Sequence, residues 1–272
     1  MSVGGCLAVA GVEFAKLRAQ IKSQVVLAAC VVAPLAFAVA TRVQSTLPED
    51  TLFGRSVKES GFAVALVVLG FAALWVLPVL TSIVGGDVFA AEDRYGTWKT
   101  LLTRSRSRSE IFAGKVITSL VFAVLAVAAL AASSLAAGLL LIGRQPLIDL
   151  SGTLVPPAKA IERVTLAWAS TVPPTLAFTS LAVLISVATR NSAAGIGLPV
   201  VVAFVMQLVA FIDGPEIIRQ LLITTAFGAW HGLLSQPRYY RPLLYGTIVS
   251  AAYLITCLAL AYRLLQQRDF NA

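Results

Sequence analysis

The stretch that decides the fold is residues 62–84, FAVALVVLGFAALWVLPVLTSIV. It carries no charged side chain, and a helix needs about 20 mainly apolar residues to cross the hydrocarbon core of a bilayer. Five similar stretches occur along the chain, at Gln24–Thr41, Ile111–Ile142, Val164–Thr189, Ala193–Ile212 and Leu243–Leu264. Since a helix satisfies its own backbone hydrogen bonds in lipid, we predict an all-α membrane protein with six transmembrane helices.

The composition supports this fold class. The chain has 272 residues, of which 58% are hydrophobic and 12% charged, with a mean hydropathy of +0.86. Soluble domains carry about 25% charged residues, and disordered chains need low hydrophobicity, so both classes are excluded. The net charge of +8 fits basic loops lying on anionic lipid. Three widely spaced cysteines predict apolar fillers, with neither a disulfide framework nor a metal site.

We expect a single transmembrane domain over 1–272, divided into a cytoplasmic and interfacial segment (1–23), a six-span bundle (24–264) and a cytoplasmic tail (265–272). Within the first segment, Glu13–Ser23 predicts a short amphipathic helix on the inner membrane surface, with Lys16, Arg18 and Lys22 facing lipid headgroups. The alternative is a signal peptide, because basic residues precede an apolar run that ends in an A-x-A pattern.

The distribution of basic residues predicts the orientation. Six crossings put both termini on the same side of the membrane. With the termini inside, the inner segments carry 12 basic residues and the outer segments 9, and the inner loop after the second span holds 6 of them. Basic residues favour the cytoplasmic side, so we predict a multi-pass protein of the cytoplasmic (inner) membrane with both termini in the cytoplasm.

The predicted spans contain no Asp, Glu, Lys or Arg away from their ends. Such charges mark proton relays and ion paths, so their absence disfavours a proton-driven transporter or a channel with charged rings. The third stretch is too long for one upright crossing, and we expect it to tilt or to project its Lys115 end into water. Gln207 lies in mid-span, where it either forms an interhelical hydrogen bond or contacts substrate.

Enzyme motifs are missing. His231 is the single histidine, which rules out a two-histidine zinc motif, and we expect it at the membrane interface. There is no G-x-S-x-G and no G-x-x-x-x-G-K-[ST]. We therefore predict that the chain is not an enzyme, has no catalytic residue and does not itself bind ATP.

Two further segments carry structural expectations. The half-apolar stretch Ile217–Leu234, between the fifth and sixth spans, is either re-entrant or an interfacial helix. The pair Pro173-Pro174 predicts a kink in the fourth span.

The inner loop 85–115 reads GGDVFAAEDRYGTWKTLLTRSRSRSEIFAGK. Gly96 interrupts a charged, helix-compatible run, and Thr97 is a candidate N-cap for a short helix from Trp98 to about Arg104. That helix would place Trp98, Leu101 and Leu102 on one apolar face, which is suited to docking in a groove on a partner. The alternative is a basic loop resting on lipid headgroups. The run SRSRS at 105–109 resembles an RNA-binding pattern, but it is short and lies at a membrane exit, so we expect no nucleic acid partner.

The stretch 91–104, AEDRYGTWKTLLTR, followed by Ser107-Arg108 and Gly114-Lys115, resembles the type-2 ABC exporter permeases. That family shows an acidic pair, then Gly-Thr, a Leu-Leu-Ser/Thr run, an Arg, and a Gly-Lys that opens the third span. The six-span plan matches as well, so the resemblance covers nearly the whole chain. Ser105 departs from the pattern, because the family often has a proline there.

This resemblance implies a permease subunit that pairs with a second, identical or related, permease subunit. Two cytoplasmic ABC ATPase subunits, which bind ATP and Mg, would drive it. The loop helix would then be the coupling helix, with the partner-binding residues Glu92, Arg94, Gly96, Thr97, Trp98, Leu101 and Leu102. The second and fifth spans, which contain Pro78 and Gln207, would line the substrate path. Similar exporters also place re-entrant helices between spans five and six.

Together these features predict the transmembrane permease subunit of an ATP-driven ABC exporter. Its uncharged path suits a hydrophobic or amphipathic substrate such as a lipid, drug or peptide antibiotic. The alternative is a non-transporting membrane anchor that recruits a cytoplasmic partner through the same loop.

Overall fold

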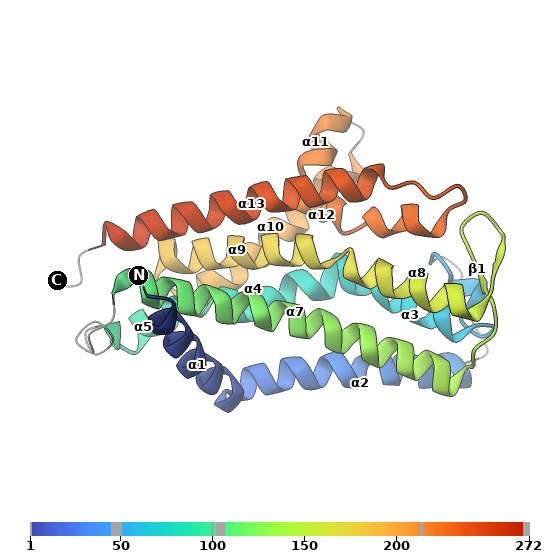
Figure 1. The fold of residues 1–272 in the computed structure, drawn as a ribbon, viewed down its shortest axis with the longest axis horizontal. Coiled ribbons are helices and arrows are strands. Elements are labelled where there is room, and N and C mark those ends of the chain that lie inside the picture. The colour runs from blue at the N-terminus through green and yellow to red at the C-terminus, as the bar shows by residue number, and fades with distance from the viewer. Residues whose placement is uncertain (1, 45–50, 99–100, 102–106, 213–214, 269–272) are drawn as a thin grey trace.

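The computed structural model describes residues 2–44, 51–98, 101, 107–212 and 215–268. Within these ranges the protein is a bundle of long helices (Figure 1). Six helical segments are long and apolar enough to cross a membrane: Ile21–Val43, Gly61–Gly85, Arg108–Leu141, Pro157–Thr189, Ser192–Ala210 and Arg241–Gln266. Each one overlaps a predicted span, which confirms the prediction of an all-α, multi-pass membrane protein.

The chain begins with two helices that meet at a corner. Helix α1 spans Val3–Ala19, and Ser2 caps it by accepting a hydrogen bond from the backbone N–H of Gly5. Helix α2 spans Ile21–Val43, and the extended backbone of Gln20 separates the two. The first helix is therefore longer than the predicted Glu13–Ser23 and ends before Ser23. Two basic residues of the predicted helix were expected to face lipid headgroups but pair with other side chains. Lys16 forms ion pairs with Glu13 and Glu92, and Lys22, at the start of α2, pairs with Asp87.

The second span is a helix with a defect in its middle. Helix α3 (Gly61–Phe71) runs into a π-helical turn at Ala72–Val76 and then into α4 (Leu77–Gly85). The N–H of Leu77 bonds to the carbonyl of Ala72, five residues back. Helix α3 packs on α7 (Arg108–Leu141) where Gly61 meets Gly138, and a Cβ added at Gly61 would lie 2.2 Å from the Gly138 oxygen. Small residues of this kind let transmembrane helices approach closely.

The third and fourth spans differ in continuity. Helix α7 is unbroken and starts with a capping box formed by Ser107 and Glu110. The fourth span is split into α8 (Pro157–Ala169) and α9 (Val172–Thr189). The break immediately precedes Pro173-Pro174, which confirms the predicted kink.

The last two spans flank a segment of short helices. Helix α10 spans Ser192–Phe211, capped by the Asn191 side chain, and α13 spans Arg241–Gln266 and packs on α9. Between them lie α11 (Glu216–Leu221), α12 (Ile223–Ala226) and a 3₁₀ helix at Ala229–Leu234. Helix α11 projects from the bundle (Figure 1) and buries no residue. In contrast, Ile223, Phe227 and Trp230 lie in the main core, so the segment from α12 onward packs into the bundle. Whether 217–234 is re-entrant or interfacial stays a prediction.

A small hairpin was not predicted. Strand β1 (Leu147–Ile148) pairs antiparallel with β2 (Leu154–Val155). Asp149 closes the turn by accepting hydrogen bonds from the N–H groups of Ser151 and Thr153. Strands of two residues are too short to show the alternation that identifies a strand in a sequence.

The two ends of the bundle carry different elements. The N-terminus, the last described turn of α13 and the short helix α5 (Ala90–Arg94) lie at one end, as an even number of spans requires, and the hairpin lies at the other (Figure 1). The three cysteines, Cys6, Cys30 and Cys257, are free and buried, in agreement with their prediction as fillers.

Candidate functional site

At the end of the bundle that holds both termini, four charged side chains from three helices meet. Lys115, on the second turn of α7, places its Nζ 3.0 Å from Glu13 Oε2 of α1, 2.8 Å from Glu92 Oε1 of α5 and 3.0 Å from the carbonyl oxygen of Val88. Lys16 reaches the same carboxylates, at 2.8 Å from Glu13 Oε1 and 3.1 Å from Glu92 Oε1. We call Glu13, Lys16, Glu92 and Lys115 the four-charge cluster.

The burial of Lys115 corrects a prediction. We expected the third span either to tilt or to project this end into water, and the second alternative is wrong, because the Lys115 side chain is only 1% exposed. Its Nζ also lies 5.9 Å from the centre of the Phe89 ring. A buried ammonium is tolerated when it is paired and hydrogen-bonded, and here three acceptors surround it. The sequence could not reveal the pairing, since Glu13 lies 102 residues before Lys115.

The electrostatics keep Glu92 ionised. Burial by itself raises the pKa of this carboxyl, but the attraction of Lys115, hydrogen bonds from Lys115 and Thr97, and the charge of Lys16 outweigh it and lower the pKa to about 2. The Thr97 hydroxyl donates to Glu92 Oε2, and Glu92 is buried. Both residues are predicted partner contacts, but here Glu92 holds the loop to the bundle through Lys115 and Lys16, and Thr97 braces Glu92 from within the loop.

Two more ion pairs fasten the same loop. Asp87, just after α4, pairs with Lys22 of α2 and lies 3.9 Å from Arg94. Burial raises the pKa of Asp87, but hydrogen bonds with Lys22 and Ser192 and the charges of Lys22 and Arg94 together outweigh it and lower the pKa below its usual value. Beyond the end of α13, Arg268 pairs with Asp93 at 2.9 Å. The loop Asp87–Trp98 is thus tied to α1, α2, α7 and the end of α13.

Trp98 packs inward, which differs from the prediction that it presents an apolar face to a partner. Its side chain is 6% exposed and stacks on Phe89, with 6.3 Å between ring centres. The guanidinium of Arg268 lies 5.4 Å from the Trp98 ring, and Leu101 packs on the same apolar cluster as Trp98. Sequence periodicity indicates that such a face is buried, but it does not show against what.

The expected coupling helix is described only in part. Its predicted break is confirmed, because Gly96 has a φ of +64°, a value that favours glycine. The N–H of Leu101 bonds to the carbonyl of Thr97 at 3.0 Å, as at the start of a helix. Leu102 lies outside the described residues, as do 99–100 and the rest of the segment up to 106.

Within the described residues of the loop Asp87–Trp98, the exposed side chains are those of Arg94 and Tyr95, and we call this pair the tip of the loop. Tyr95 is 69% exposed, and the Arg94 guanidinium lies 4.7 Å from the centre of its ring. Arg94 was predicted as a partner contact, whereas Tyr95 was not. The only signal for Tyr95 in the sequence was its position between the acidic pair and Gly-Thr.

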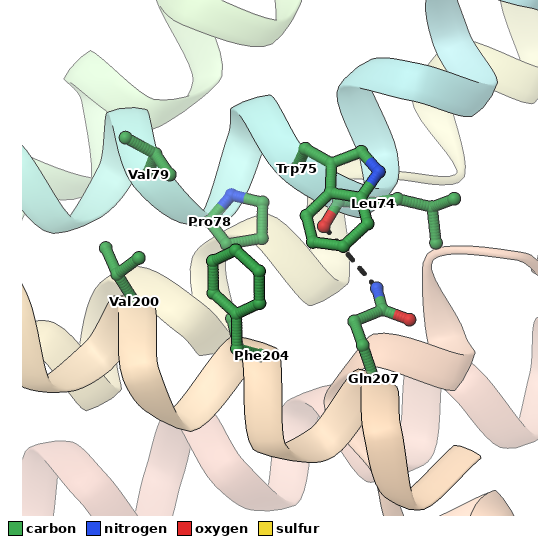
Figure 2. Close-up of a pocket in the computed structure, with 8 residues that line it drawn as sticks. Leu74, Trp75, Pro78, Val79, Val200, Phe204 and Gln207 are labelled. Atoms are coloured by element: carbon green, nitrogen blue, oxygen red, sulfur yellow. Dashed lines mark hydrogen bonds between the residues drawn. The ribbon is translucent and has the colours of Figure 1, made fainter. Parts of the chain in front are cut away.

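Pro78 and Gln207, the predicted substrate-path residues, are brought together between α4 and α10 (Figure 2). The Gln207 amide donates to the carbonyl of Leu74 over 3.4 Å. Pro78 stands four residues after Leu74 and has no N–H with which to bond that carbonyl. The space here is about 10 Å³, which is about the room of one water. The structure thus shows the interhelical hydrogen bond and no room for a substrate at this point.

The described residues suggest no metal centre, because within them no three His, Cys, Asp or Glu side chains gather closely enough to hold an ion. A comparison with curated proteins finds no match to this chain. A family model described as a protein of unknown function (DUF2705) matches residues 26–271. Since that match covers most of the sequence, the chain belongs to the DUF2705 family.

Proposed function

We propose that this chain is the transmembrane permease subunit of an ATP-driven exporter that resembles the type-2 ABC exporters. The observation that carries the proposal is the anchoring of the loop Asp87–Trp98 to four elements of the bundle. Through Glu92 the loop contacts Lys16 of α1 and Lys115 of α7, and through Asp87 it contacts Lys22 of α2. A force applied at its tip would move these helices together, which is what a coupling element requires.

The distribution of charge supports an external source of energy. In the described spans the charged side chains lie near the helix ends, as Lys115 and Arg163 do. They do not form a continuous row through the middle of the bundle. A proton relay needs such a chain of ionisable groups. The ATP and Mg would be bound by separate cytoplasmic ATPase subunits, which places the termini and the loop tip in the cytoplasm.

The remaining surfaces fit a two-permease assembly. Helix α10 turns large apolar side chains outward at Leu198, Val201, Phe204, Val205 and Leu208, so it can meet lipid or a second permease subunit, identical or related. The middle of the described spans, which carries no charged side chain, suits a hydrophobic or amphipathic substrate, such as a lipid, drug or peptide antibiotic.

Purification of the tagged chain from native membranes tests the proposal. We expect an ATPase to copurify and its activity to be lost in Tyr95→Asp, because this change puts a carboxylate on the exposed tip. Tyr239→Asp is the matched control, since Tyr239 is 52% exposed and precedes α13 at the opposite end. In proteoliposomes, the complex should move a fluorescent lipid only when ATP is present. Copurification of an ATPase without any ATP-dependent movement of lipid or hydrophobic dye would favour the non-transporting anchor instead.

A further inference from the structure

A large cavity lies on the side of the second span that faces α2, and Leu74 and Trp75 separate it from the small notch at Pro78. Its volume is about 770 Å³, within the range of about 300–1,000 Å³ that is usual for ligand sites. Its walls are α2, the second span around the π turn, and the turn Phe227–His231. Neither the four-charge cluster nor the predicted coupling residues contribute to it.

The lining of the cavity is apolar along the helices and polar at one place. The helical walls are formed by side chains such as Phe37, Leu66 and Trp75. Thr51 and His231 also line it, and both stand on segments that connect spans. These two segments touch, because the rings of Phe53 and Trp230 lie 6.4 Å apart. The cavity therefore has a long apolar body and a polar end.

His231 is suited to an uncharged role at this end. Burial lowers the pKa of its imidazole below the usual 6.5, so the ring is neutral at pH 7. A neutral imidazole has one hydrogen-bond donor and one acceptor, and it can pair with the polar groups of a lipid-like headgroup.

The cavity opens toward the hydrocarbon layer. Phe71 and Trp75 line it and are exposed on a helix that is long and apolar enough to span the membrane. Apolar cavities stay dry and bind apolar molecules, and in this setting the apolar molecule within reach is a lipid chain. The π turn Ala72–Val76 forms part of the wall, and π turns within helices often occur at functional sites.

We propose that this cavity binds the apolar chain of an amphiphile taken from the bilayer, with the headgroup held at the Thr51–His231 end. The proposal deepens the proposed function, on which it rests for any transport of the bound molecule, by naming the site and the substrate class. Binding itself requires no ATPase, so the two proposals can fail separately.

The test uses the purified full chain in nanodiscs that contain a phosphatidylcholine with a photoactivatable diazirine in one acyl chain. Illumination should attach the lipid mainly to peptides that contain residues 66–76 and 227–231. Ala33→Trp should reduce this labelling about tenfold, because the indole fills the cavity that the chain occupies. Ala33 lines the cavity and is exposed, so a larger side chain there leaves the helix packing intact.

The matched control is Val32→Trp. Val32 is the neighbouring residue on α2 and is also exposed, but it does not line the cavity, so labelling should stay at the wild-type level. Gly70→Trp provides a second way to fill the cavity from the opposite wall.

Labelling that is spread evenly over outward faces such as α10 and is unchanged in Ala33→Trp and Gly70→Trp would indicate annular lipid only and overturn the inference. If an ATPase still copurifies in that case, the exporter proposal survives alone. If cavity labelling is found without any ATPase partner, the binding site survives alone.

Discussion

Each end of the bundle buries an ion pair, and the two are built differently. At the hairpin end, Asp149 accepts two backbone N–H bonds, pairs with Arg163, 14 residues away, at 3.1 Å, and accepts a hydrogen bond from the Gln236 side chain at 3.0 Å. At the other end, the carboxylates of the four-charge cluster are held by side chains, and Lys115 joins Glu92 and Glu13 from 23 and 102 residues away. The first arrangement closes the turn of the hairpin and ties that turn to α8 and to the segment before α13. The second joins separate helices, so it can transmit a displacement between them.

Breaking the four-charge cluster at its centre should have the largest effect. Lys115→Met leaves Glu13 and Glu92 buried and close together, with only the half-buried Lys16 to neutralise them. Removal of one partner of a buried ion pair costs about 3–5 kcal/mol, and we expect a loss of this size in the free energy of unfolding measured in lipid. Lys159→Met, at an exposed lysine of α8 near the opposite end, is the control. A Lys115→Met protein as stable as this control would show that the cluster does not hold the helices.

Breaking the ion pair at the hairpin end should cost less and should leave coupling intact. Asp149→Asn keeps an oxygen for the N–H groups of Ser151 and Thr153 but removes the charge that pairs with the buried Arg163. We expect a loss of about 2–3 kcal/mol, with the ATPase activity per folded complex unchanged. The comparison is with a partly destabilised variant of the four-charge cluster, such as Glu13→Gln. If the ATPase activity per folded complex falls as much in Asp149→Asn as in that variant, the proposed difference between the two ends is wrong.

Acid should weaken the four-charge cluster. The pKa of Glu92 is about 2 in the folded protein against an ordinary value of 4.5. A carboxyl with a lowered pKa stabilises the fold in full above its unfolded pKa, and this contribution is lost as the pH falls toward the folded pKa. Unfolding temperatures should therefore drop between pH 4.5 and about 2.

Glu92→Gln provides the comparison for this acid effect. The variant should be less stable at neutral pH but flatter across the acid range, with a residual slope from Asp87, whose pKa is also lowered. Curves of equal slope for wild type and variant would mean that Glu92 does not contribute to the acid sensitivity.

The smallest effect is expected in the middle of the bundle. The hydrogen bond from Gln207 to the Leu74 carbonyl is long, at 3.4 Å, and interhelical hydrogen bonds in membranes contribute about 0.6 kcal/mol on average. Gln207→Leu should change the free energy of unfolding by about that amount, as measured beside Leu208→Ala on the exposed side of α10. A loss of several kcal/mol would mean that this uncharged region contributes more to the stability of the bundle than the ion pairs at its ends.

The sequence predicts the parts of this fold that depend on local pattern. Hydropathy identifies the six spans, and Pro173-Pro174 and Gly96 locate two breaks correctly. The π turn at Ala72–Val76 and the hairpin at Leu147–Val155 were missed, because neither leaves a periodic signal. The pairing of Glu13 with Lys115 depends on which helices pack together, and no spacing rule reaches across 102 residues.

The predicted site likewise has parts that the local sequence predicts and parts that depend on the packing of the folded chain. The loop was identified from its motif, and Gly96 has the expected conformation. Glu92, Thr97 and Trp98 turn inward instead of toward a partner. Glu92 pairs with the buried Lys115 of α7, Thr97 donates to Glu92, and Trp98 stacks on Phe89 of the same loop. The exposed surface at Tyr95 became visible only in the folded chain.

The central claim is that the tip of the loop Asp87–Trp98 contacts an ATPase. A photo-crosslinking amino acid at position 95, compared with the same amino acid at position 239 and illuminated in native membranes, tests it most directly. The account predicts that position 95 forms an adduct with an ATP-hydrolysing polypeptide and that position 239 does not. Adducts with such a polypeptide at neither position, or equally at both, would contradict it.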